Sequence, residues 1–249
     1  MIARALHRWL AFALVVGIVT ALGASAQPAT PAKAAASALQ ARLATKAPLL
    51  ALARAGARLV AVGDWGTVVL SDDLGKTWRQ ATSVATRSML TSVAFVDAKR
   101  GYAVGHGGTV LETSDGGDTW TRNHDAGADV VLLTIWFENA DRGIAAGAFG
   151  FAMSTHDGGR TWKEFTPGAG DDRDRHLNAV FAAPGGPVFI AAESGTVFRS
   201  NDGGASWATS FRTTIRPERQ TLSAVTIGPT GTLVVAGLSG IGTHALAAP

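Results

Sequence analysis

Four aspartates stand at the same place in four copies of one motif, Ser/Thr-x-Asp-x-Gly-x-Ser/Thr-Trp. A carboxylate can serve as a general acid or base in catalysis. In each copy, however, the Asp can accept hydrogen bonds from the backbone N–H groups just ahead of it, as in an Asx turn. The following Gly can adopt the positive φ that closes such a turn. We therefore predict structural turns with no catalytic residue at Asp73, Trp78, Asp115, Trp120, Asp157, Trp162, Asp202 and Trp207.

The elements around these motifs recur with them. The motif tryptophans are separated by 42, 42 and 45 residues, a period typical of repeat architectures. Each repeat is expected to begin with an apolar strand and to continue with a short second strand and a glycine turn. A third strand then leads into the motif, and the Trp begins a fourth. The first strands are expected at residues 49–53, 90–96, 132–137, 177–182 and 222–227.

Four short strands per repeat predict an all-β fold, a β-propeller of four-stranded blades. Four blades are complete in the sequence. The fifth matches only the first half of a repeat, over residues 222–241, after which no Asp motif follows. The chain is therefore expected to be a shortened propeller.

The N-terminal residues are typical of an export signal. Arg4 and Arg8 precede an apolar run at residues 9–22, and Ala24-Ser25-Ala26 forms a small-x-small cleavage site. The run is shorter than the ~20 residues of a membrane-spanning helix. We expect cleavage before Gln27 and a periplasmic or other extracytoplasmic location, with an uncleaved anchor as the alternative. Residues 1–26 are thus interpreted as a signal peptide, 27–47 as an Ala/Pro-rich linker that could be partly helical at 34–43, and 48–249 as the propeller domain.

The amino-acid composition limits the kinds of ligand and partner that the protein is expected to bind. The net charge of +3 becomes +1 once residues 1–26, with two arginines and no acidic residue, are removed. A nearly neutral chain offers no general argument for binding nucleic acid. The absence of Cys excludes disulfides, metal thiolates and thiol nucleophiles. The histidines lack zinc-site spacing, so we expect neither a metal nor a small-molecule cofactor.

The repeat itself carries a family resemblance. Residues 101–111, followed by Thr113-Ser114-Asp115-Gly116-Gly117, resemble the Asp-box propellers built from bacterial neuraminidase repeats. More narrowly, they resemble the photosystem II assembly/stability factor family and its relatives in non-photosynthetic bacteria. The resemblance covers about residues 48–241. It implies an exported, non-enzymatic scaffold, seven-bladed in the family, that binds other proteins at the membrane surface and helps to assemble membrane protein complexes.

A glycoside hydrolase of the sialidase type is the alternative, because it shares the Asp turns. That resemblance implies a Tyr nucleophile paired with an acid and a cluster of arginines. The only tyrosine is Tyr102, where we align Leu59, Ile144 and Val188 in other repeats, which indicates a packing position. A pocket holding Tyr102 beside an acid, near several of Arg122, Arg142 and Arg199, would favour the hydrolase.

A binding face is expected where the turns between second and third strands meet the connections between blades, opposite the Asp turns. The candidates at these turns are Trp65, His106, Phe149 and Glu193. Exposed aromatic residues are enriched among protein-interface anchors. The alternative is that each side chain packs under a neighbouring loop.

The connection at residues 168–176 should belong to the same face. Its mixed charges predict a solvated loop, with a divalent-cation site through Asp171, Asp172 and Asp174 as the less favoured alternative.

Overall fold

The computed structural model of the protein describes residues 36–182, 185–212, 221–227, 232–237 and 240–245. The predicted signal peptide lies outside these residues. Within them, the regular elements are β-strands and four three-residue 3-10 turns: η1 (Ala44–Lys46), η2 (Asp64–Gly66), η3 (Ala148–Gly150) and η4 (Gly170–Asp172). The predicted all-β class is confirmed.

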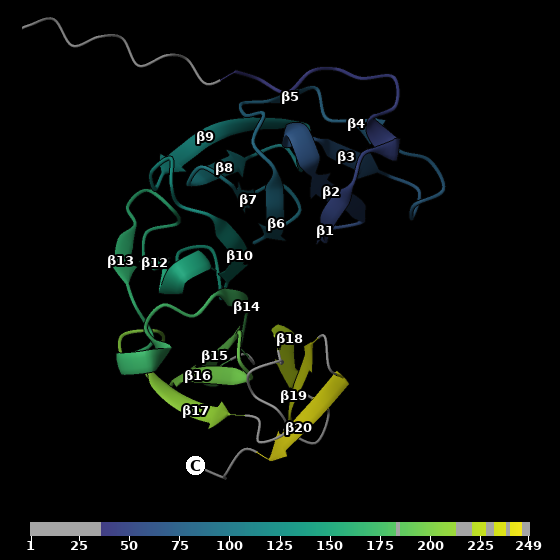
Figure 1. Ribbon diagram of the computed structural model, residues 1–249. Helices are drawn as coiled ribbons and strands as arrows, with labels where there is room; N and C mark the ends of the chain where they lie inside the picture. The colour runs from purple at the N-terminus through teal and green to yellow at the C-terminus, as the bar shows by residue number, and fades with distance from the viewer. Residues whose placement is uncertain (1–35, 183–184, 213–220, 228–231, 238–239, 246–249) are drawn as a thin grey trace, which may run out of the picture. The chain divides into compact units, whose positions relative to one another are not determined.

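The strands form five successive antiparallel sheets, which follow one another along the chain in Figure 1. We number the sheets in chain order. Sheet 1 contains β1 (Leu49–Ala55), β2 (Arg58–Gly63), β3 (Val68–Ser71) and β4 (Arg79–Gln80); sheet 2 contains β6 (Leu90–Phe95), β7 (Gly101–Gly105), β8 (Thr109–Thr113) and β9 (Thr119–Asp125); sheet 3 contains β10 (Leu132–Phe137), β11 (Gly143–Gly147), β12 (Ala152–Thr155) and β13 (Lys163–Phe165); sheet 4 contains β14 (Leu177–Ala182), β15 (Val188–Ala192), β16 (Thr196–Ser200) and β17 (Ala208–Arg212); sheet 5 contains β18 (Leu222–Ile227), β19 (Thr232–Gly237) and β20 (Gly240–Ala245).

The strand order within sheets 1, 3 and 4 is the simple meander of a propeller blade. The predicted first strands agree with β1, β6, β10, β14 and β18 to within two residues. In sheet 5, Gly240–Ala245 pairs antiparallel with β19 as a third strand, although the Asp motif is missing there. The half-repeat predicted from the sequence therefore forms a three-stranded sheet within the described residues.

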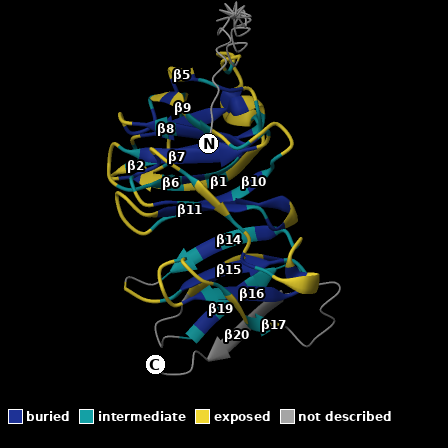
Figure 2. Cartoon of the chain, turned by 90° about the vertical axis from the view of Figure 1, so that its left-hand side faces the viewer, coloured by how far each residue is buried: buried dark blue, intermediate teal, exposed yellow. Residues whose placement is uncertain are grey.

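The second strand lies in the interior of each of the middle sheets. Every residue of β7, β11 and β15 is buried, and these strands form part of the dark blue interior in Figure 2. Such strands need small and apolar side chains on both faces, as in Gly143-Ile144-Ala145-Ala146-Gly147. The glycine at the end of the strand is needed because the backbone passes very close: a Cβ at Gly147 would lie 1.9 Å from the Val131 carbonyl oxygen.

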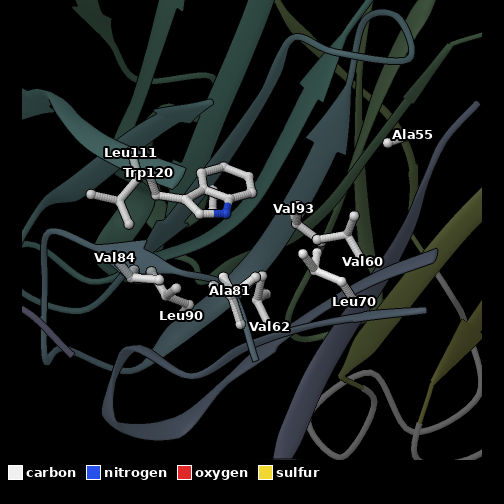
Figure 3. Close-up of a cluster of buried hydrophobic side chains, with 12 residues drawn as sticks. Ala55, Val60, Val62, Leu70, Ala81, Val84, Leu90, Val93, Leu111 and Trp120 are labelled. Atoms are coloured by element: carbon white, nitrogen blue, oxygen red, sulfur yellow. The ribbon is translucent and has the colours of Figure 1, made fainter. Parts of the chain in front are cut away.

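Neighbouring sheets pack face to face through their first and second strands. Leu90 and Val93 of β6 lie in one buried cluster with Val60, Val62 and Leu70 of sheet 1, and Figure 3 shows this cluster. The same arrangement recurs between sheets 2 and 3, 3 and 4, and 4 and 5. Repeated burial of apolar surface between sheets is the main stabilising contribution in this architecture.

Polar side chains also join neighbouring sheets at the first strand. The Thr91 hydroxyl donates to the Leu132 carbonyl at 2.7 Å, and the Asn178 side-chain amide donates to the Leu222 carbonyl at 2.8 Å. Both bonds link the beginning of one first strand to the beginning of the next. The sheets are therefore held in register by hydrogen bonds as well as by apolar contacts.

Two segments outside the repeat extend the first sheets. β5 (Ser83–Val84), in the connection after sheet 1, pairs in parallel with β9. The chain before β1 then packs on this connection: the Ala38 N–H donates to the Val84 carbonyl, and the Gln40 side chain donates to the Ala81 carbonyl. Part of the segment predicted as a linker therefore contacts the folded unit, and of the helix considered at residues 34–43, residues 36–43 are not helical.

Candidate functional site

The turn between the second and third strands is fixed by the chain just before its own sheet. In each of sheets 1 to 4, the first turn residue donates its backbone N–H to the carbonyl of the residue that precedes the first strand. The pairs are Asp64 with Pro48, His106 with Met89, Ala148 with Val131 and Glu193 with His176, at 2.9 to 3.0 Å. These turns and the connections between sheets therefore share one side of the propeller, which we call the connection face.

Trp65 and Phe149 project from the connection face. Each is the central residue of a 3-10 turn and adopts a left-handed conformation, with φ of 54° and 55°. Their side chains are 72 % and 71 % exposed. They do not pack under neighbouring loops, which was the alternative. A non-glycine residue in this conformation costs on the order of 1 kcal/mol or more, and such strain tends to occur at functional sites.

His106 and Glu193 belong to the same turns but occupy a different position. They stand first in their turns, next to Gly107 and Ser194, which are the structural counterparts of Trp65 and Phe149. His106 is exposed and Glu193 is half-buried. The four predicted binding residues thus lie on one face, while only the two aromatic residues share a position.

His176, at the end of the connection expected on this face, makes a contact with Phe149 that the sequence did not indicate. Its ring meets the ring of Phe149 edge-on, with centroids 4.9 Å apart. The Gly150 N–H also donates to the carbonyl of Arg175. The turn of sheet 3 therefore packs against the connection into sheet 4, and a partner of Phe149 would lie close to the imidazole of His176.

The connection at residues 168–176 is mostly exposed, as expected of a solvated loop, but one of its carboxylates is buried and anchors it. Asp172 is only 8 % exposed. Its carboxylate accepts from Arg175 at 2.7 Å and also pairs with Arg212 of β17. Burial opposes ionisation of Asp172, but the two guanidinium groups outweigh it, so its pKa is below the ordinary value. The buried charge is thus compensated within the protein.

No group of three or more His, Cys, Asp or Glu in the described residues is placed to hold a metal ion. This applies to Asp171, Asp172 and Asp174, the alternative considered from the sequence. Within the same residues, no helix has both the length and the apolar character needed to cross a membrane.

The four Asp motifs have the hydrogen bonds expected of structural turns. In the first, the Asp73 carboxylate accepts from the backbone N–H and the hydroxyl of Thr77, at 2.8 and 2.6 Å. The Ser71 hydroxyl donates to the same carboxylate and accepts from the Gly75 N–H. The bonds recur in the motifs of Asp115, Asp157 and Asp202.

These hydrogen bonds favour the ionised carboxylates. The pKa of Asp73 and that of Asp157 are lowered to about 2, chiefly by the hydroxyls of Thr77 and Thr161. A carboxylate this acidic is a poor proton donor near neutral pH. The electrostatics therefore agree with a turn-forming role.

The motif tryptophans differ in their surroundings. Trp120 is 1 % exposed and lies in the cluster between sheets 1 and 2 that Figure 3 shows, where its indole N–H donates to the Gly117 carbonyl. Trp78, Trp162 and Trp207 are half-buried. The indole N–H of Trp162 donates to the Asn123 side chain of the preceding sheet instead of a motif glycine.

A repeated arginine contact accompanies the Asp turns. Arg58, the first residue of β2, donates to the Gly116 carbonyl and to Asp118 in sheet 2. Arg100 occupies the same place in sheet 2 and donates to the Ala140 carbonyl in sheet 3. These contacts join neighbouring sheets at the side opposite the connection face.

Tyr102 is a packing residue. It is fully buried, its ring stacks on Phe137 with centroids 4.3 Å apart, and its hydroxyl donates to the Gly158 carbonyl at 2.7 Å. Burial raises its pKa to about 12. Glu112, which is half-buried, lies within 3.4 Å of the hydroxyl, but Tyr102 itself is fully buried and its hydroxyl already donates to a backbone carbonyl.

The register corrects the alignment used for this position. Tyr102 corresponds to Val60, Ile144 and Phe189, one residue away from Leu59 and Val188 in two of the repeats. The corresponding side chains are all buried.

The arginines proposed for a hydrolase have local partners. Arg122 pairs with Asp125 at 2.9 Å, Arg142 approaches Glu138 at 3.8 Å, and Arg199 donates to the Asn201 side chain at 2.7 Å. They and Tyr102 therefore do not form the site that would favour a sialidase-type hydrolase.

Solved structures with a similar fold come from different functional classes. A structure titled "YCF48 bound to D1 peptide" has a TM-score of 0.61 and 20 % identity, covering 87 % of this chain and 70 % of that chain. YCF48 from Cyanidioschyzon merolae has a TM-score of 0.60 and 16 % identity, with 82 % and 70 % coverage. An ancestral GH74 enzyme reaches a TM-score of 0.61 and 14 % identity, covering 80 % of this chain but 30 % of the enzyme. These similarities establish the propeller fold and do not distinguish a binding protein from an enzyme.

No curated protein sequence matches this chain significantly. The sequence model of one family does match, over residues 80–130 and 122–226, and together these segments cover more than half of the chain. They include the Asp motifs of sheets 2, 3 and 4. The chain belongs to the family described as photosynthesis system II assembly factor YCF48.

Proposed function

We propose that this protein is an exported, non-enzymatic assembly factor that binds another protein at a membrane surface through its connection face. The observation that carries the proposal is the pair of exposed aromatic residues, Trp65 and Phe149, held in left-handed turns. A large exposed apolar side chain that also strains its backbone brings no evident stability to the monomer. Both features are accounted for if the two rings are buried by a partner.

The kind of partner follows from the family and from one similar structure. That structure is titled as YCF48 bound to a D1 peptide, so a related propeller holds a peptide segment of another protein. By analogy, the partner proposed here is an exposed segment of a membrane protein, presented during assembly of its complex. Such a segment suits the connection face, because Trp65 and Phe149 offer apolar contacts and the imidazole of His176, next to Phe149, offers a polar one.

Export is the second part of the proposal. It rests on the apolar segment and the Ala24-Ser25-Ala26 site near the N-terminus. Fractionation of the source cells, followed by mass spectrometry of the N-terminus, tests it. We expect an extracytoplasmic protein that begins at Gln27, and recovery of the uncleaved chain in the cytoplasm would contradict export.

Site-specific photo-crosslinking tests the binding face. A photoreactive amino acid is placed at Trp65 or Phe149 in the full chain and activated in intact cells. The control places it at Leu74, which is equally exposed, at 72 %, on the opposite side of the propeller. We expect one membrane protein to crosslink at both aromatic positions and not at Leu74. Equal crosslinking at all three positions would refute the assignment of the face.

A further inference from the structure

Each internal junction in this propeller buries the same two surfaces. We call the side of a sheet that carries the apolar residues of its first strand the front face, and the opposite side the back face. In sheets 2 to 5 the front face is formed by Leu90, Leu132, Leu177 and Leu222, exposed by 0 to 4 %, and by Val93, Ile135, Val180 and Val225, exposed by 5 to 9 %. Each front face packs on the back face of the preceding sheet.

The front face of sheet 1 has the same chemistry but is uncovered. Leu49 and Leu52 occupy the positions of the buried leucines and branched residues, yet they are 40 % and 59 % exposed. Leu50 is 51 % exposed beside them. With Ala61 and Trp78 they line an apolar pocket of about 310 Å³. The segment around η1 contributes Ala44 to this side, where it covers Ala61 and Val69 and leaves the leucines open.

The back face of sheet 5 is the counterpart. Val234 and Ala236 of β19 are half-buried. The residues at the position of Val234 in the other sheets are Val60, Tyr102, Ile144 and Phe189, which the next sheet buries to between 0 and 3 % exposure. Among the described residues, the front face of sheet 1 is thus exposed and the back face of sheet 5 is only half-buried, and the four internal junctions show that the two kinds of face fit together.

We propose that the front face of sheet 1 binds the back face of sheet 5 in a second copy of this chain. The contact is heterologous, so each copy retains one unused face, and association proceeds to a closed ring or to a chain of copies. The driving force is burial of the exposed leucines, since contiguous apolar surface of this kind marks interaction sites. This inference does not rest on the proposed function, because it uses sheet faces instead of the connection face.

Paired variants test the proposal by analytical ultracentrifugation of the purified full chain over a range of concentrations. Leu52→Asp disables the front face, and Val234→Asp disables the back face. The matched control is Leu74→Asp, which places the same charge at an exposed leucine outside both faces. Circular dichroism verifies folding, and Ala236→Glu replaces Val234→Asp if that variant does not fold.

We expect the wild type and Leu74→Asp to associate as concentration rises, and each face variant alone to remain monomeric. An equimolar mixture of the two face variants should form a dimer and nothing larger, because the mixture contains one working face of each kind. A wild type that stays monomeric at all concentrations overturns the proposal. So does a Val234→Asp variant that still associates with itself, since this would indicate pairing of two front faces.

Discussion

Leu74 is the one motif residue whose backbone conformation conflicts with its side chain. It follows Asp73 in the first Asp turn and has a φ of 62°. The other three motifs place Gly116, Gly158 and Gly203 there, with φ between 69° and 73°. The side chain of Leu74 is 72 % exposed, so its replacement removes little packing. We predict that Leu74→Gly stabilises the protein.

The expected gain is the difference between two opposing contributions. The left-handed conformation costs an L-residue roughly 1–2 kcal/mol. Glycine avoids this cost but loses more conformational entropy on folding, which cancels about 0.5–1 kcal/mol of the stabilisation. The net increase in the free energy of unfolding is therefore about 1 kcal/mol, which corresponds to a rise in Tm of roughly 2–4 °C for a domain of this size.

Thermal and urea unfolding, followed by circular dichroism, measure the effect. Leu74→Ala is the matched control, because it removes the exposed side chain but keeps a Cβ in the left-handed conformation. The reverse change, Gly158→Leu, should be strongly destabilising, since a Cβ there would also lie 2.9 Å from the Ala140 carbonyl oxygen. If Leu74→Ala stabilised as much as Leu74→Gly, loss of an exposed apolar side chain would explain the gain, and the reasoning from backbone strain would be refuted.

Three further predictions concern buried and ionised groups. Trp120→Ala should cost about 3–5 kcal/mol in urea unfolding and Trp78→Ala clearly less, because only Trp120 is fully buried; equal costs would contradict this. Because the pKa of Asp73 is lowered to about 2, its contribution to stability is present above about pH 4 and lost as the pH falls toward 2; thermal melts of the wild type and Asp73→Asn should converge over that range. Asp172→Asn should cost on the order of 3 kcal/mol by leaving two guanidinium groups uncompensated, whereas Asp171→Asn, at an exposed position, should leave Tm unchanged.

The repeat made most of the fold predictable. The Asp motif combines a turn-forming carboxylate, a glycine and a tryptophan at fixed spacing, so each copy marks one hairpin and its two strands. Ser71 and Thr77, for example, have the hydroxyls that the turn uses, and both are part of the motif. Contacts within about ten residues of the motif could thus be inferred from one copy and transferred to the others.

Contacts between distant segments were not predictable in this way. The burial of Asp172 depends on Arg212, forty residues later, so the sequence predicted a solvated loop but not the one buried carboxylate within it. The packing of Gln40 on Ala81 and the register of Tyr102 depend on tertiary pairing as well. The candidate binding turns were found from the sequence, but the exposure of Trp65 and Phe149 and the contribution of His176 required the structure.

The central claim is that a protein partner covers the aromatic turns of the connection face. The most direct test measures the Kd of the crosslinked partner, purified, for the wild type and for the Trp65→Ala/Phe149→Ala double variant by isothermal titration calorimetry. Loss of two anchor side chains should weaken binding at least tenfold, with the melting temperature unchanged or slightly raised, because both side chains are exposed and strained. An unchanged Kd in a folded double variant would contradict the account.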